Sequence, residues 1–455
     1  MTPMEYLKQN ERRSLEQLKE VLRIPSVSAQ SQHKDDVRRC AQWVVDYLKS
    51  IGLKSELCET GGHPLVYGHY HVSDQAKTIL IYGHYDVQPV DPLNLWKTTP
   101  FDPTEDGDYL IARGSSDDKG QFFAHVKGAE AYLKTVGKLP VNLKFMIEGE
   151  EETAAENLNA FIKNNKDRFA ADVVLVSDGS QYGPGMPAIN YGLRGIAFVE
   201  VKVIGPDRDL HSGSFGGVVA NPIIVLAKMI GQLHDESGRV AIGGFYDNVY
   251  TMSDWELQQL KKLPFDEKTY LASTGALKLW GEKGYSVLQR LASRPTLDCN
   301  GITGGYQGEG GKTIIPSWAS TKITMRLVPN MNPQEICDKL EAHLRRICPD
   351  TVRLEVVKHG GANPVIVPTD GPWLEAAARA IKTGFGKEPY FTKEGGSIPV
   401  VEAFKSVLGL DTLLVGFGQH DDNTHSPNER LSIGDFHRAC RTSAALLDEL
   451  SNVKV

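Results

Sequence analysis

Four short apolar runs without polar alternation stand out along the chain. They occupy residues 78–82, 143–147 (broken by Lys144), 173–176 and 413–415. Runs of this kind are typical of strands buried on both faces, as in a parallel sheet that helices cover. Helical patterns at residues 121–135 and 156–166 lie between the runs, and the first 50 residues predict two more helices. The alternation therefore predicts an α/β fold, a mostly parallel sheet with helices on both faces.

The pattern changes near residue 195. Residues 197–203 alternate apolar and polar positions, which indicates a half-exposed antiparallel strand. The order strand-helix-strand-strand-helix-strand that follows resembles a split βαβ unit, and the first pattern resumes near residue 370 with an Ala-rich helix. We therefore predict an α+β domain inserted into the α/β domain, which divides the chain into residues 1–192, 193–365 and 366–455.

Composition narrows the classes of function. The 455 residues include 50 Lys and Arg against 57 Asp and Glu, and a net charge of −7 predicts no preference for nucleic acid or anionic lipid. There is no run of 18 apolar residues, and the first 20 residues are charged throughout, unlike a signal peptide. Six scattered cysteines without a CxxC pair argue against a disulfide framework or a cysteine zinc site. We predict a cytoplasmic protein that binds neither nucleic acid nor membrane.

Potential metal ligands follow the predicted buried strands. They are the pair His84 and Asp86, the acidic run 148–152, Asp178 and His425. Two further acids, Asp117 and Asp118, stand in a glycine-flanked loop that leads into a predicted helix. Because open α/β sheets bind ligands at the carboxyl ends of their strands, these groups should converge in one crevice.

Carboxylates that gather in this way need compensation. Their mutual repulsion and desolvation cost several kcal/mol, which one or two divalent cations would offset. A two-metal centre polarises a carbonyl and lowers the pKa of a bridging water, while a nearby Glu moves the proton to the leaving nitrogen. The mixture of His and carboxylate suits Zn, Mn or Co better than Ca. The residues alone leave open which member of each pair or run is the ligand.

Five segments together identify a family resemblance. GHYDV, RGSSDDKG, EGEEET, VSDG and NTHSPNE resemble the motifs of the di-zinc metallopeptidases, which include carnosinases, cytosolic non-specific dipeptidase, glutamate carboxypeptidase and aminoacylase. The resemblance spans nearly the whole chain. It implies that two metals are bound by His84, Asp117, Glu152, Asp178 and His425, with Asp117 bridging. It further implies Glu151 as general base, Asp86 as the partner that orients His84, and a cis peptide between Asp117 and Asp118.

Other segments resemble the cytosolic non-specific dipeptidase branch in particular. His211, in DLHSG, resembles a lid histidine that enters the partner subunit's active site and polarises the substrate carbonyl. The segments around Thr313 and Arg326 resemble lid segments that bind the substrate carboxylate, which a guanidinium matches bidentately. Gly396 and Ser397 lie in a segment that resembles a substrate-contacting loop. The resemblance implies a homodimer in which the inserted domain provides lid and dimerisation surfaces.

We therefore predict metal-dependent hydrolysis of the peptide bond of dipeptides, with two divalent ions per subunit, Zn or Mn, with Co as a third option. One alternative is an N-acyl-amino-acid deacylase or carboxypeptidase that uses the same site. Another is a non-catalytic metal-binding protein. A nucleotide-binding function is rejected, because Tyr306 occupies the position where a phosphate loop ending at Gly311-Lys312-Thr313 requires its first glycine.

Overall fold

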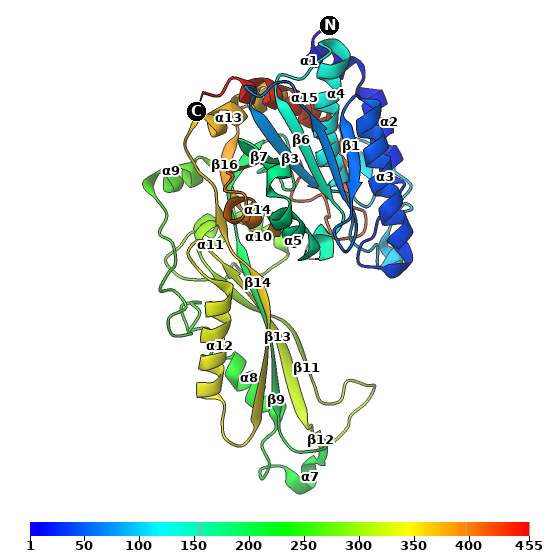
Figure 1. Ribbon diagram of the computed structural model, residues 1–455. Helices are drawn as coiled ribbons and strands as arrows, with labels where there is room; N and C mark the ends of the chain where they lie inside the picture. The colour runs from blue at the N-terminus through cyan, green and yellow to red at the C-terminus, as the bar shows by residue number, and fades with distance from the viewer. Residues whose placement is uncertain (154–155, 397, 455) are drawn as a thin grey trace. The chain divides into compact units, whose positions relative to one another are not determined.

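The structure is a computed structural model that describes residues 1–153, 156–396 and 398–454. The chain forms two compact units (Figure 1). Unit 1 consists of Met1–Tyr191, Val367–Glu394 and Ile398–Val455, and unit 2 contains Gly192–Ile366 together with Gly395 and Gly396. The described part of the chain contains no helix long and apolar enough to cross a membrane.

Unit 1 is built on a nine-stranded sheet, of which the last strand in the order, at residues 365–366, belongs to unit 2. Its four middle strands are parallel and lie in the order β6 (Asn142–Glu148), β3 (Thr78–His84), β7 (Val173–Val176) and β17 (Thr412–Leu414). These are the four apolar runs, so the predicted buried parallel strands are confirmed. The outer strands are β1 (Lys54–Cys58) and β2 (Leu65–Tyr70) beside β6, and β8 (Ala188–Leu193), β15 (Val365–Ile366) and β16 (Tyr390–Glu394) beyond β17. Of these, β1, β2, β8 and β15 pair antiparallel, as edge strands of an otherwise parallel sheet often do.

Helices cover both faces of this sheet (Figure 1). Successive side chains of a strand point to opposite faces, so the apolar strands present apolar side chains to the helices on each side. On one face Gly83 of β3 lies so close to α4 (Lys119–Thr135) that a Cβ would approach Phe122 to 2.5 Å. On the other face the ring of Tyr82 meets Phe404 of α14 (Pro399–Ser406) at a centroid distance of 5.7 Å. On the first face α3 (Lys34–Ser50) packs on β1 and β2, while α13 (Pro372–Phe385), α15 (Ile433–Ser451) and α4 pack on one another. The predicted two-sided cover is confirmed.

The N-terminal prediction of two helices is wrong in number. Three α-helices form there, because α1 (Pro3–Gln9) and α2 (Glu11–Leu22) are separate and precede α3. The break falls at Asn10, whose side-chain amide donates to the Tyr6 carbonyl at 2.8 Å and ends α1. The smaller elements of unit 1 are η1 (Ser31–His33), η2 (Leu93–Leu95), η3 (Glu151–Thr153), α5 (Glu156–Asn164), α6 (Lys166–Phe169) and a small sheet of β4 (Thr104–Asp106), β5 (Tyr109–Ile111) and β18 (Arg430–Ser432).

Unit 2 contains a four-stranded antiparallel sheet. Its order is β11 (Thr296–Gly304), β13 (Trp318–Leu327), β9 (Gly195–Ile204) and β14 (Arg353–Ala362). The apolar positions of β9 alternate as predicted, with Ala197, Val199, Val201 and Val203 buried against α8 (Pro222–Ile230) and α12 (Pro333–Ile347). Strand β11 was not predicted from the sequence, because its residues 298–303 are exposed and show no buried face.

The remaining elements of unit 2 are short. A two-stranded ladder joins β10 (Leu210–His211) to β12 (Ile314–Ile315). The helices are α7 (Ser212–Phe215), α9 (Asp254–Lys262), α10 (Glu267–Thr274) and α11 (Val287–Ser293). Ser253, Asp266 and Ser286 cap the last three of these through side-chain oxygens that accept main-chain N–H groups.

Candidate metal centre

The predicted ligands meet at the carboxyl ends of the parallel strands of unit 1. His84 is the last residue of β3, Glu152 lies in η3 just after β6, and Asp178 follows β7 by two residues. Asp117 comes from the loop before α4, and His425 from the loop between β17 and β18. The expectation that these groups share one edge of the sheet is thus confirmed by the fold.

Asp117 lies at the middle of the cluster. Its Oδ1 is 3.0 Å from His84 Nε2 and its Oδ2 is 3.0 Å from His425 Nε2. One carboxylate therefore faces a different imidazole with each oxygen, which is the arrangement required of a ligand shared by two ions.

The other two acids extend the cluster on either side of Asp117. Asp178 Oδ2 is 3.9 Å from His84 Nε2, and Glu152 Oε2 is 3.3 Å from His425 Nε2. Ligand atoms of His84, Asp117 and Glu152 all lie within 4.8 Å of one another, close enough to hold a single ion. The five predicted ligands thus form one continuous chain of contacts.

Asp86 supports this cluster from behind. Both the Asp86 carbonyl oxygen, at 3.1 Å, and its Oδ1, at 3.4 Å, lie next to His84 Nδ1, so Nδ1 is the donor and Nε2 is left to bind. The second oxygen, Oδ2, accepts from Ser28 Oγ at 2.6 Å and from the Glu152 N–H at 3.2 Å. Asp86 therefore fixes the imidazole and the neighbouring acid together.

The Asp117 loop has the backbone that the family resemblance implied. The peptide between Asp117 and Asp118 is cis. Asp118 is buried and its Oδ2 accepts from the His84 N–H at 3.1 Å, so it holds the backbone at the end of β3. Gly120 is required by close packing, since a Cβ there would lie 2.0 Å from the Ser115 carbonyl oxygen.

The charges of the centre are not balanced by the protein alone. Burial raises the pKa of Glu152 to about 9 and that of Asp178 to about 6, and the Asp117 charge adds to both rises. Burial also holds the pKa of Glu151 well above its usual range, despite the attraction of nearby His84. The carboxyls of Glu151, Glu152 and Asp178 thus resist ionisation beside the charged Asp117. Divalent cations fit this set of donors, because their charge would return each acid to its ionised form.

The two histidines behave in the opposite sense. Burial lowers the pKa of His84, but its bonds to Asp117 and Asp86 outweigh burial and hold the pKa well above its ordinary value. The bond to Asp117 likewise raises the pKa of His425. Burial raises the pKa of Asp117, yet its bonds to the two imidazoles outweigh burial and hold that pKa below its usual range. The same Nε2 atoms that face Asp117 are the atoms that would bind the ions.

The predicted base, Glu151, lies in η3 next to Glu152. Its carboxyl interacts electrostatically with His84, Asp178 and Asp117, so it faces the ligand cluster. Its role in proton transfer stays a prediction.

The predicted substrate-binding residues belong to unit 2. Exposed His211 lies on β10, paired with Ile314 of β12, and the Ser212 N–H donates to the Thr313 carbonyl at 3.0 Å, so His211 and Thr313 are neighbours. Arg326 lies on β13, and partial burial of Arg194, together with the charge of Arg326, lowers the pKa of the Arg194 guanidinium to about 10. Gly396 is exposed, and Ser397 lies outside the described residues. The contacts of these residues with substrate stay predictions.

Sequence reasoning missed several residues that hold the ligands. Gln88 donates to Glu152 Oε2 at 2.6 Å. Glu429 accepts hydrogen bonds from the main chain of the Asp117 loop. The available signal for Glu429 was its place four residues after His425 in a segment already singled out, although an acid in a loop is ordinarily solvated.

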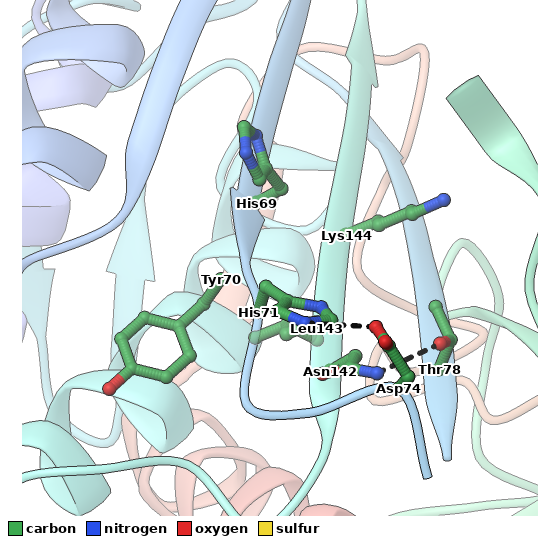
Figure 2. A pocket seen from close by; sticks show the side chains of 8 residues that line it. All are labelled: His69, Tyr70, His71, Asp74, Thr78, Asn142, Leu143 and Lys144. Carbon is green, nitrogen blue, oxygen red and sulfur yellow. Dashed lines mark hydrogen bonds and ion pairs between the residues drawn. The ribbon is translucent and has the colours of Figure 1, made fainter. Parts of the chain in front are cut away.

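A separate pocket of about 290 Å³ lies at the opposite ends of the parallel strands, where β3 and β6 begin (Figure 2). Thr78 and Asn142, the first residues of β3 and β6, line it, whereas His84 ends β3. Figure 2 shows His71 turned toward Asp74, at 3.4 Å, and Asn142 toward Thr78. Lys144, which also lines the pocket, donates to two main-chain carbonyls. The pocket thus lies at the opposite end of β3 from the ligand cluster, and His71 and Lys144 both have partners.

The fold and the cluster define an α/β metalloenzyme with its ligands at the strand ends. The chain belongs to peptidase family M20/M25/M40, whose family model matches residues 80–449. It is 33% identical to a Cys-Gly metallodipeptidase of Candida albicans over 455 aligned positions, covering 95% of this chain and 93% of that protein. The family resemblance inferred from the motifs is confirmed.

Two solved structures share the whole fold. Human carnosine dipeptidase 1 superposes with a TM-score of 0.87 at 30% identity, covering 99% of this chain and 98% of that one. An M20-family metallo-carboxypeptidase from Sulfolobus solfataricus superposes with a TM-score of 0.86 at 35% identity, covering 96% and 99% of the two chains. The relatives therefore share one fold but carry the names of two peptidase activities.

Proposed function

We propose that the protein is a dipeptidase that depends on two divalent metal ions and hydrolyses the single peptide bond of free dipeptides. The observation that carries the proposal is the Asp117 carboxylate, whose two oxygens each face a different histidine at 3.0 Å. The dipeptidase names of the Candida and human relatives support the substrate class.

The contacts support a division of the ligands between two ions. His84 and Asp178 would hold one ion and His425 and Glu152 the other, with Asp117 shared between them. Imidazole and carboxylate donors suit Zn, Mn or Co. When bound, the ions polarise the scissile carbonyl and make water acidic enough to lose a proton near neutral pH.

The chain's own residues perform the proton transfers in this proposal. Glu151 accepts the proton of the attacking water and delivers it to the leaving nitrogen. Asp86 keeps His84 in the tautomer that presents Nε2 to the ion. Burial raises the pKa of Glu151, and bound ions would lower it again toward the range in which a carboxylate can accept a proton and return it.

Residues of unit 2 complete the site in a homodimer, with His211 contributed from the partner subunit. The Gly213 N–H donates to His211 Nδ1 at 3.0 Å, which leaves Nε2 as the protonated nitrogen of an exposed ring. That tautomer is a hydrogen-bond donor, as polarising a substrate carbonyl requires. Arg326 would bind the substrate carboxylate, with Thr313, Gly396 and Ser397 as further contacts.

The proposed location is the cytoplasm. All six cysteines are free, and Cys40, Cys58, Cys337 and Cys440 are buried. Unpaired thiols of this kind suit a reducing compartment.

A carboxypeptidase is the second candidate. It is favoured by the Sulfolobus relative, which is 35% identical and is named a metallo-carboxypeptidase. Both activities would use the same ligands and the same base, so they differ in the length of peptide that is accepted.

A substrate panel separates the candidates. Metal-depleted enzyme and enzyme restored with Zn or Mn are incubated with dipeptides, tripeptides, longer peptides and N-acyl amino acids. The proposal expects hydrolysis of dipeptides that chelation abolishes and metal restores. Release of C-terminal residues from longer peptides at comparable rates would instead establish the carboxypeptidase, and cleavage of N-acyl amino acids alone would overturn the dipeptidase assignment.

A further inference from the structure

An ion pair between Arg113 and Glu429 lies beside the metal centre without contributing a ligand. The two residues are 316 positions apart in the chain, and the distance between Arg113 Nη1 and Glu429 Oε2 is 2.8 Å. Their side chains are 1% and 0% exposed. A buried pair of charges is costly to desolvate, and its mutual attraction offsets that cost only where further hydrogen bonds satisfy its remaining donors and acceptors.

Glu429 uses both carboxylate oxygens to hold the loop that carries Asp117. Oε2 accepts the Gly114 N–H at 2.8 Å in addition to the guanidinium. Oε1 accepts the N–H groups of Ser116 at 2.9 Å and of Asp117 itself at 3.0 Å. Four donors thus converge on one carboxylate, and one of them belongs to the residue at the middle of the ligand cluster.

Arg113 ties two other ligand-bearing loops to the same point. Its Nη2 donates to the Pro89 carbonyl at 3.1 Å and to the Ser426 carbonyl at 3.2 Å. Pro89 lies on the loop that follows His84, and Ser426 is the residue after His425. The guanidinium is also packed over the ring of Trp96, at 5.5 Å from the centroid.

We propose that the Arg113–Glu429 pair is a positioning device that fixes the loops of His84, Asp117 and His425 in the metal-free protein and thereby sets its metal affinity. The pair touches neither the proposed ions nor the substrate, so it acts through the ligands. Loss of such supporting contacts typically weakens metal binding about 10- to 100-fold. The inference rests on the proposed metal centre but not on the identity of the substrate.

Two variants test the pair. In Glu429→Gln one acceptor oxygen becomes an NH₂ group, which must then face donors that the carboxylate accepted. In Arg113→Lys the charge remains, but a point-like ammonium replaces the planar fork that reaches three oxygens. The matched control is Glu282→Gln, because Glu282 forms a bidentate pair with Arg294 at 2.7 and 2.8 Å, largely buried, within unit 2.

The measurement is a titration of metal-depleted protein with Zn or Mn in competition with a chromophoric chelator, at a temperature where circular dichroism shows each variant to be folded. We expect dissociation constants about 10- to 100-fold higher in Glu429→Gln and raised in Arg113→Lys, with wild-type values in Glu282→Gln. At saturating metal, kcat on dipeptides should return close to the wild-type value. If Glu429→Gln does not fold, Arg113→Lys decides.

The failures of the two proposals are distinguishable in this titration. A wild-type protein that takes up no metal refutes the metal centre. A wild type and folded variants that bind metal equally tightly refute the positioning role alone, as does a fall in kcat at saturating metal without a change in affinity.

Discussion

His125 should make the folded protein less stable in acid, because its buried site disfavours the charged imidazole. The ring is fully buried in α4, with Nδ1 3.0 Å from Ser443 Oγ and Nε2 2.8 Å from Ser177 Oγ. Burial lowers the pKa of His125 from 6.5 to about 3. Ser177 directly precedes Asp178, so this ring also supports a predicted metal ligand.

The sign and size of the effect follow from linkage. Between pH 6.5 and about 3 the unfolded chain binds a proton at His125 that the folded chain does not, so stability falls as the pH falls through this window. At pH 5, 1.5 units below the unfolded pKa, the loss is about 2 kcal/mol at about 1.36 kcal/mol per unit. This value is the same for any folded pKa below about 4, because the folded ring is then neutral at pH 5.

The assay compares wild type with His125→Gln by urea denaturation in excess chelator, followed by circular dichroism at pH 7.5 and 5.0. The variant should be less stable at pH 7.5 by about 1–3 kcal/mol, since it loses hydrogen bonds of the imidazole. Between the two pH values the wild type should lose about 2 kcal/mol more than the variant, and all other titrating groups cancel in this difference. Equal losses in the two proteins would refute the reasoning.

Two further predictions concern the proposed reaction. Glu151→Gln should retain both metals, as elemental analysis can show, yet its kcat should fall about 10²- to 10⁴-fold because proton transfer is lost. The control Glu150→Gln should stay near wild type, and near wild-type turnover in Glu151→Gln would exclude Glu151 as the base. His211→Ala should lose activity, and hybrid dimers formed by mixing it with Glu151→Gln should regain part of it, whereas His359→Ala, at another exposed histidine of unit 2, should be active alone. Absence of complementation after proven subunit exchange would contradict a site shared between subunits.

The parallel core of the fold could be predicted because burial on both faces leaves a local signature. The runs that became β3, β6 and β7 are apolar except for Thr78 and Lys144, and the ligand His84 lies two residues after the first of them. Strand β11 has no such signature, because most of its side chains are exposed and its position is set by pairing with β13. The break between the first two helices at Asn10 depends on one cap and leaves the apolar period intact, so the pattern did not reveal it.

Within the site, residue type and spacing were not sufficient to separate Asp117 from Asp118. The two acids are adjacent, but the first lies between two imidazoles and the second accepts the N–H of His84. The family resemblance made this assignment, and local chemistry did not. Gln88 and Glu429 were missed for a different reason, since their partners are distant in sequence and contact them only after folding, and the place of Glu429 near His425 did not reveal its role.

The missed contacts follow a common rule that explains why the centre has so many buried acids. Three ligands have their main-chain N–H groups held by a carboxylate that comes from another segment and is not itself a proposed ligand. The pairs, ligand first, are Glu152 with Asp86, His84 with Asp118, and Asp117 with Glu429. All three supporting acids are completely buried. A carboxylate that binds an N–H fixes the backbone from which the ligand projects, while the ligand's own oxygens or nitrogens remain available for an ion. The acidic side chains at the strand ends therefore form two groups. One group would bind metal, and the other orders the loops before metal is bound.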